Sequence, residues 1–147
     1  TEKESRAEVL WEQYGRKIEI ESRVLSDMTL NHILPVATRY QSVLLDNVSK
    51  IKESFPAAEF RTLALNEIDL IRDISSHISE ARSMARKMDV LCDELARIGE
   101  ERERSIRFHD EVVPLMESTR EHVDALEMII DDQMWPLPKY REMLFIH

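Results

Sequence analysis

Residues 71–95 read IRDISSHISEARSMARKMDVLCDEL, and no other part of the chain constrains its folding as strongly. Small or apolar side chains recur there at alternating spacings of three and four residues: Ile71, Ile74, Ile78, Ala81, Ala85, Met88, Cys92 and Leu95. This is the a/d pattern of a helix that packs against other helices along its length. Four heptads in one register predict a long helix in an all-α fold.

The predicted helix extends beyond this stretch in both directions, over about residues 56–98. We expect it to begin near Pro56, because a proline in the first helical turn gives up no hydrogen bond. Its predicted end is Ile98, followed by Gly99 at a position where a left-handed residue commonly caps a helix. The charged residues 100–104 would then form a solvated turn or a frayed helix end.

Two more helices are predicted, over about residues 2–53 and 105–133. The apolar seam of the first runs to Met28 and resumes at Val36 after a phase adjustment, where Pro35 lies. Pro114 lies near the start of the other. Proline removes a backbone hydrogen bond and clashes with a carbonyl one turn earlier, so both helices should bend or break. We therefore predict one domain over residues 1–147: an antiparallel bundle of three long helices, the first and third bent at proline, with a short C-terminal helix.

The tail, residues 134–147, ends the helical pattern with two prolines and then presents apolar and aromatic side chains. Trp135 and Leu137 precede prolines and favour extended backbone, and a short final helix could run from Lys139 to Phe145. Its candidate docking side chains are Trp135, Pro136, Leu137, Tyr140, Leu144 and Phe145. Either the tail caps its own bundle, or it packs on another domain or subunit, where Trp and Tyr contribute most.

Helix lengths predict which segments meet. At about 1.5 Å per residue, the second helix folds back along the first and ends beside residues 10–15. Trp11 and Tyr14 are then poorly covered. The third helix brings the tail beside residues 35–40. There a polar segment surrounds the proline: Asn31, His32, Pro35, Arg39 and Tyr40. These groups either stabilise the bend by satisfying a freed carbonyl or contact another domain or subunit.

Composition and charge limit the kinds of partner that this chain can bind. The formal net charge of −9 argues against nucleic acid, which needs a basic face. No basic run of five residues occurs, so an anionic membrane surface is also disfavoured, and no stretch is apolar enough to span a bilayer. A single cysteine permits no intrachain disulfide and fits a cytoplasmic protein.

The sequence offers no built catalytic or metal site. No Glu-x-x-His pair of the kind used by di-metal helical bundles is present, and the two glycines stand far apart rather than in a phosphate-binding loop. Cys92 lies on the seam and is predicted to be a buried, inert thiol. Asp73 and His77 should form a surface ion pair. We assign no catalytic, cofactor-binding or metal-binding residue. A small helical enzyme would need arginines and glutamates around a common pocket.

Two segments together carry a family resemblance. LNHILPVATRYQ, residues 30–41, and DDQMWPLPKYREMLF, residues 131–145, resemble the C-terminal helical region of type III glutamine synthetases. Residues 20–23 and 55–57 also fit that pattern. Enzymes of this family condense glutamate with ammonia using ATP and divalent metal ions, Mg²⁺ or Mn²⁺, and assemble as double-ringed oligomers. Their metal-binding and nucleotide-binding residues lie in an upstream catalytic domain.

The resemblance implies a non-catalytic structural and assembly domain, with the catalytic domain missing upstream of Thr1. Its implied partners are that catalytic domain and the neighbouring subunits of a homo-oligomer, with neither nucleic acid nor membrane. The alternative is a stand-alone helical adaptor or sensor bundle that presents its tail to an unrelated partner.

Overall fold

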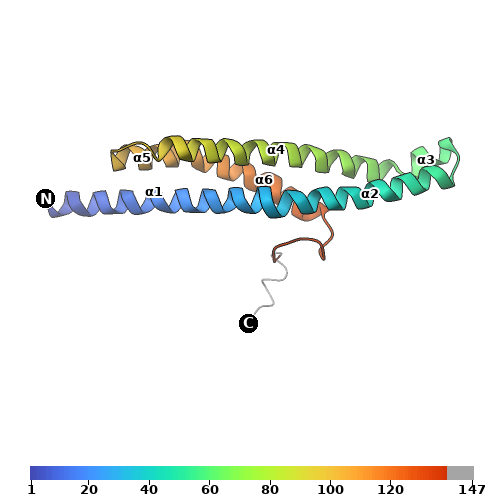
Figure 1. Ribbon diagram of the computed structural model, residues 1–147, viewed down its shortest axis with the longest axis horizontal. Helices are drawn as coiled ribbons and strands as arrows, with labels where there is room; N and C mark the ends of the chain where they lie inside the picture. The colour runs from blue at the N-terminus through green and yellow to red at the C-terminus, as the bar shows by residue number, and fades with distance from the viewer. Residues whose placement is uncertain (139–147) are drawn as a thin grey trace.

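The computed structural model describes residues 1–138, and every element in this part of the chain is helical, which confirms the all-α class. The elements in chain order are α1 (Glu2–Met28), the π-helical turn η1 (Thr29–Ile33), α2 (Leu34–Ser54), α3 (Ala57–Leu63), α4 (Leu65–Leu95), α5 (Glu101–Arg107), the π-helical turn η2 (Phe108–Val112) and α6 (Val113–Ile129). Figure 1 shows a rod in which α2 follows α1 and α4 returns alongside both; α5 then packs along α1, and α6 runs back along α4. None of these helices combines the length and apolarity that a membrane span requires.

The helix does not break before Pro35 or Pro114, because a π-helical turn precedes each of them. The Leu34 N–H donates to the Thr29 carbonyl, five residues earlier, and the Val113 N–H donates likewise to the Phe108 carbonyl. Such a turn contains one residue more than an α-helical turn. It gives the proline ring room against the preceding carbonyl and supplies the phase adjustment that the apolar seam requires.

The predicted helix over residues 56–98 corresponds to two helices. Pro56 is the N-cap of α3, and α4 follows after Ala64, which is buried. The end of α4 also differs from expectation, since α4 stops at Leu95 and Gly99 has no positive φ. A left-handed cap is unnecessary there, because the Arg97 and Ile98 N–H groups donate to the Glu94 and Leu95 carbonyls at 3.2 and 3.1 Å.

The core follows the α4 seam as predicted. Its fully buried members are Ile74, Ala81, Ala85, Met88, Cys92 and Leu95. Small polar residues of α1 face them. The Ser26 hydroxyl donates to the Asp89 carboxylate at 2.7 Å, and the Ser22 hydroxyl lies 3.2 Å from the Cys92 sulfur. Small side chains let α1 and α4 approach closely, and these contacts satisfy the buried hydroxyls.

The two glycines provide a matched test of how closely α1 packs on α5. A Cβ at Gly15 would lie 2.5 Å from the Ser105 hydroxyl oxygen and 3.4 Å from the Ser105 Cα. We expect Gly15→Ala to lower the local free energy of unfolding by about 1–3 kcal/mol, because overpacking outweighs the gain in helix propensity. Hydrogen exchange of α1 and α5 amides in the intact protein would measure the loss.

Gly99→Ala is the control, since a Cβ there meets nothing within 4 Å and the backbone φ is not positive. It should change stability by at most about 1 kcal/mol, toward a more stable fold. Equal effects of the two substitutions would contradict close packing at Gly15.

Candidate interaction surfaces

The N-terminal end of the rod carries an apolar groove, which we call the N-terminal groove. It has a volume of about 750 Å³ and is lined by Ala7, Leu10, Trp11, Tyr14, Ile106, His109 and Asp110. The expectation that Trp11 and Tyr14 are poorly covered holds only in part. Ser105 of α5 donates a hydrogen bond to the Trp11 carbonyl, and the Tyr14 hydroxyl lies 2.6 Å from His109 Nδ1. Leu10, one turn before Tyr14, remains 65% exposed.

The polar segment around Pro35 forms a second surface at the middle of the rod. The Asn31 amide donates to the Asp27 carboxylate at 2.7 Å, so it does not satisfy a freed backbone carbonyl. His32 also approaches Asp27, with Nε2 4.0 Å from Oδ2. Pro35 and Arg39 are exposed, whereas Tyr40 packs partly against the core. Exposed groups on a continuous helix are therefore available to a partner.

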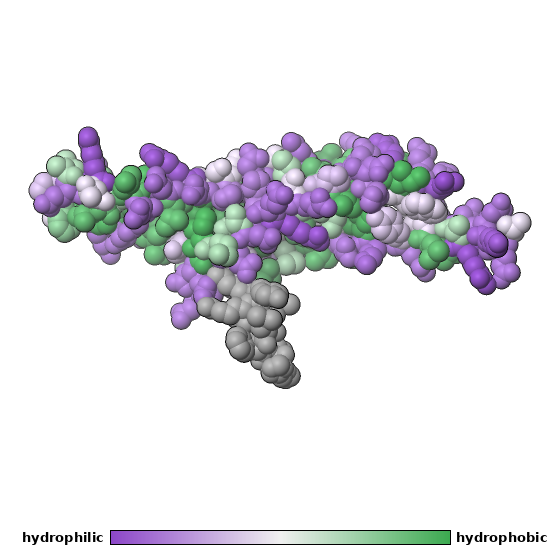
Figure 2. All heavy atoms as spheres, turned by 180° about the vertical axis from the view of Figure 1, so that it is seen from behind, coloured by the Kyte–Doolittle hydropathy of each residue, from purple (hydrophilic) through white to green (hydrophobic). Residues whose placement is uncertain are grey.

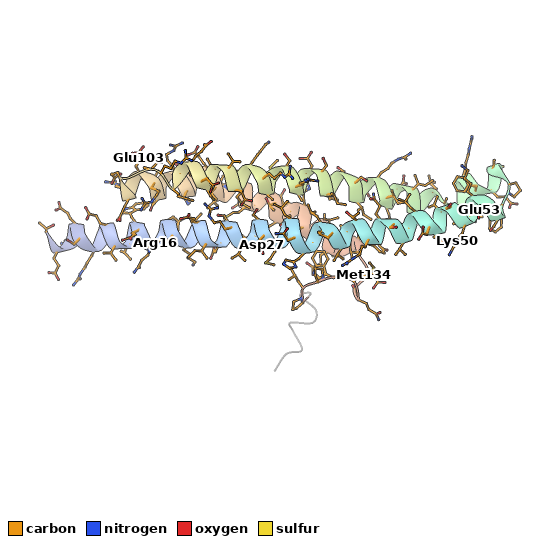
Figure 3. All side chains as sticks on the ribbon, in the orientation of Figure 1. Arg16, Asp27, Lys50, Glu53, Glu103 and Met134 are labelled. Atoms are coloured by element: carbon orange, nitrogen blue, oxygen red, sulfur yellow. The ribbon has the colours of Figure 1, made fainter. Side chains whose placement is uncertain are left out.

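The start of the tail lies beside this segment. After α6, the Met134 and Trp135 N–H groups donate to the Asp131 carbonyl, which turns the chain back toward the start of α2. Figure 3 shows Met134 on this turn, close to the α1–α2 junction. Trp135 is only 7% exposed and belongs to the cluster that contains Ile33 and Val36. Met134 and Leu137 pack against the same cluster.

The side chain that opens the tail thus packs on its own bundle. Pro136 is exposed and Leu137 is half-buried. Tyr140, Leu144 and Phe145, together with the predicted helix 139–145, lie outside the described residues. Within residues 1–138, the start of the tail packs on the same core cluster as the start of α2, so it lies beside residues 35–40 as helix-length arithmetic predicted.

A third surface, which sequence reasoning missed, lies at the opposite end of the rod from the N-terminus. Phe55, Leu63 and Leu65, which flank α3, are each about half exposed, and Figure 2 shows apolar surface at that end. The sequence predicted the turn at Phe55-Pro56, where Phe55 has extended backbone. Reading residues 56–98 as one helix concealed the second break, at Ala64.

The predictions for His77 and Cys92 of α4 have different outcomes. The predicted ion pair between Asp73 and His77 is wrong, because His77 on α4 faces His122 on α6 with the two Nδ1 atoms 3.0 Å apart. Cys92 is buried as predicted, and burial raises the pKa of its thiol. No group of three or more His, Cys, Asp or Glu side chains within residues 1–138 is arranged to hold a metal ion.

The sequence of this chain is similar to members of a known protein family. A family model of the glutamine synthetase C-terminal domain matches residues 1–52, which include the Pro35 segment. A glutamine synthetase of Bacteroides fragilis (strain YCH46) is 41% identical over 145 residues, covering 99% of this chain and 20% of that protein. The resemblance to type III glutamine synthetases is confirmed. A type-3 glutamine synthetase of Dictyostelium discoideum is 26% identical over the same share of each chain.

This chain therefore corresponds to a glutamine synthetase C-terminal domain and spans about one fifth of the length of the curated relatives it matches. Both matches cover 99% of the chain, so the similarity is not confined to the helical middle.

The burial of Trp135 in this glutamine synthetase domain predicts a stabilising role. Trp135→Ala should lower the free energy of unfolding of the bundle by about 3–5 kcal/mol, because it removes a large buried side chain and leaves a cavity. Hydrogen exchange of α2 and α6 amides in the intact protein would measure this. Met128→Ala, at a side chain 86% exposed, is the control and should change stability by less than about 0.5 kcal/mol. Similar effects of both would mean that Trp135 does not hold the tail on the bundle.

Proposed function

We propose that this chain is the non-catalytic structural and assembly domain of a type III glutamine synthetase. In the whole enzyme, ATP-dependent condensation of glutamate with ammonia takes place in a separate catalytic domain, which also holds the Mg²⁺ or Mn²⁺. The observation that supports this is the similarity over 99% of the chain to glutamine synthetases that are about five times as long. No residue of this chain is given a role in binding ATP or metal.

The distribution of exposed side chains supports an assembly role. The N-terminal groove, the Pro35 segment with the tail, and the turn around α3 lie at one end, the middle and the other end of the rod. Stable interfaces centre on apolar and aromatic anchors with a polar rim. A rod with three such surfaces can contact its own catalytic domain and neighbouring subunits of a homo-oligomer at once.

The Pro35 segment and the tail are the proposed interface. Asn31, His32, Pro35 and Arg39 would face the partner, with Tyr40 at the edge. The tail would contribute Pro136, Leu137, Tyr140, Leu144 and Phe145, and Trp135 would anchor the tail to the bundle. We further propose that the helices form one antiparallel domain over residues 1–147, ending in a short helix, in a cytoplasmic enzyme of the bacterial type.

Charge reversal at Arg39 tests this interface in the full-length enzyme. Arg39→Glu should raise the dissociation constant of the assembly at least tenfold, because it places a carboxylate where a cation faces the partner; sedimentation velocity measures the change. Arg120→Glu, the same charge change at an exposed position of α6, is the control and should leave assembly unchanged. Equal behaviour of the two variants would contradict the proposed interface.

Turnover by residues 1–147 alone would contradict the non-catalytic role. We expect no glutamine formation from glutamate, ammonia, ATP and Mg²⁺ by this chain, while the full-length enzyme is active in the same assay.

A further inference from the structure

A groove between α2 and α4 holds positive charge with no counterpart in the described residues. Two hollows of about 660 and 440 Å³ adjoin, since Thr38, Ile78, Arg82 and Arg86 line both of them. The larger also includes Lys87, and the smaller extends to Pro35. The groove therefore begins at the proposed interface and continues along α4. We call it the basic groove.

The cations of the basic groove are unpaired. Arg82, Arg86 and Lys87 are exposed and form no ion pair with any residue of the described chain, and no acidic residue lines either hollow. Some other arginines of the bundle do pair with carboxylates, as Arg23 does with Asp93 at 2.8 Å and Arg107 with Glu111 at 2.7 Å.

Hydrogen-bond donors accompany these cations. Ser79 and Ser83 lie one turn apart on the same face of α4, and their exposed hydroxyls make no hydrogen bond with another described residue. The wall opposite is fixed, because the Gln41 amide donates to the Ile71 carbonyl at 3.0 Å and to the Ser75 hydroxyl at 2.6 Å. The groove thus offers guanidinium, ammonium and hydroxyl donors on a braced scaffold.

We propose that the basic groove binds an acidic polypeptide segment of a neighbouring subunit; this rests on the proposed assembly function. Guanidinium groups bind carboxylates in a two-pronged geometry. Arg82 and Arg86, four residues apart on a helix, have Cβ atoms about 5–6 Å apart. Alternate residues of an extended chain are about 6.6 Å apart and point to the same side. The spacing therefore fits an acidic-x-acidic pattern, with Asp or Glu at both acidic positions.

The length of the groove favours a segment over a single anion. From Ser75 to Lys87 the helix rises about 18 Å, the span of five or six extended residues. An inorganic phosphate would occupy only a small part of this length. The smaller hollow adds an apolar floor, formed by Leu30, Leu34 and Ile78, that suits an apolar side chain flanking the acidic pair.

Charge reversal in the full-length enzyme tests the proposal. Arg82→Glu/Arg86→Glu should raise the dissociation constant of the assembly at least 100-fold in sedimentation experiments and flatten its dependence on NaCl concentration. Arg97→Glu/Arg120→Glu is the matched control, with the same charge change at exposed positions outside the groove, and should shift the constant by no more than threefold. Equal effects of the two double variants would overturn the proposal.

A benzophenone amino acid in place of Ser83 identifies the occupant in the purified, assembled enzyme. We expect a photo-cross-link that joins two subunits, to a peptide that carries two carboxylates separated by one residue; a cross-link within one subunit would overturn the proposal. A cross-link to a peptide without that pair would overturn the proposal. So would saturable binding of inorganic phosphate in the absence of any cross-link, which would make the groove a small-anion site.

The two proposals can fail separately. If Arg39→Glu weakens assembly but Arg82→Glu/Arg86→Glu does not, and position 83 gives no cross-link, the acidic segment is overturned and the assembly role stands. If Arg82→Glu/Arg86→Glu weakens assembly and position 83 captures the acidic pair, but Arg39→Glu has no effect, the groove stands and the proposed Pro35 interface falls.

Discussion

The close contact between α1 and α4 is the constraint on which the rest of the bundle depends. Ser22 and Ser26 of α1 contact the Ala85–Cys92 part of α4 directly. The contact is stable only because each hydroxyl has a partner, the Asp89 carboxylate for Ser26 and the Glu19 carbonyl for Ser22. The bonds from Ser26 to Asp89 and to the Ala85 carbonyl cross between the helices and fix the register of α1 against α4. The two larger apolar clusters then form on either side, one around Ile33 and Trp135 and the other around Met88 and Phe108.

The heptad seam of α4 was predictable from sequence because one face of the helix is buried and the opposite face is exposed, which leaves a strict periodic pattern. The division between α3 and α4 was not predictable. Ala64 there has an ordinary helix-forming side chain, and only its burial and its backbone angles of −95° and −4° mark the break. The prediction at Gly99 was wrong for a different reason. Glycine permits a left-handed cap, but the Arg97 and Ile98 N–H groups already satisfy the last carbonyls of α4.

Of the candidate surfaces, too, some could be predicted from the sequence and others could not. Helix lengths alone brought the tail beside the Pro35 segment, because the rise per residue is nearly constant. The basic groove could not be predicted. In the sequence, Arg82 and Arg86 have acidic residues within a few positions, Glu80 and Asp89 among them. Only the fold shows that Asp89 is engaged by Ser26 and that α2 closes the groove with Thr38 and Gln41.

The π-helical turns before Pro35 and Pro114 do not tolerate the loss or gain of even one residue. Each contains one residue more than an ordinary turn, and one residue of an α-helix corresponds to a rotation of about 100°. Deleting a residue from η1 would restore a regular helix and rotate everything after it by that angle. Val36, Ala37 and Leu44 would leave the core, and Arg39 would turn away from its present face. The extra residue in each turn thus rotates the helix after the turn relative to the helix before it. Each of the two helices joined by η1 can then pack its own apolar face on α4.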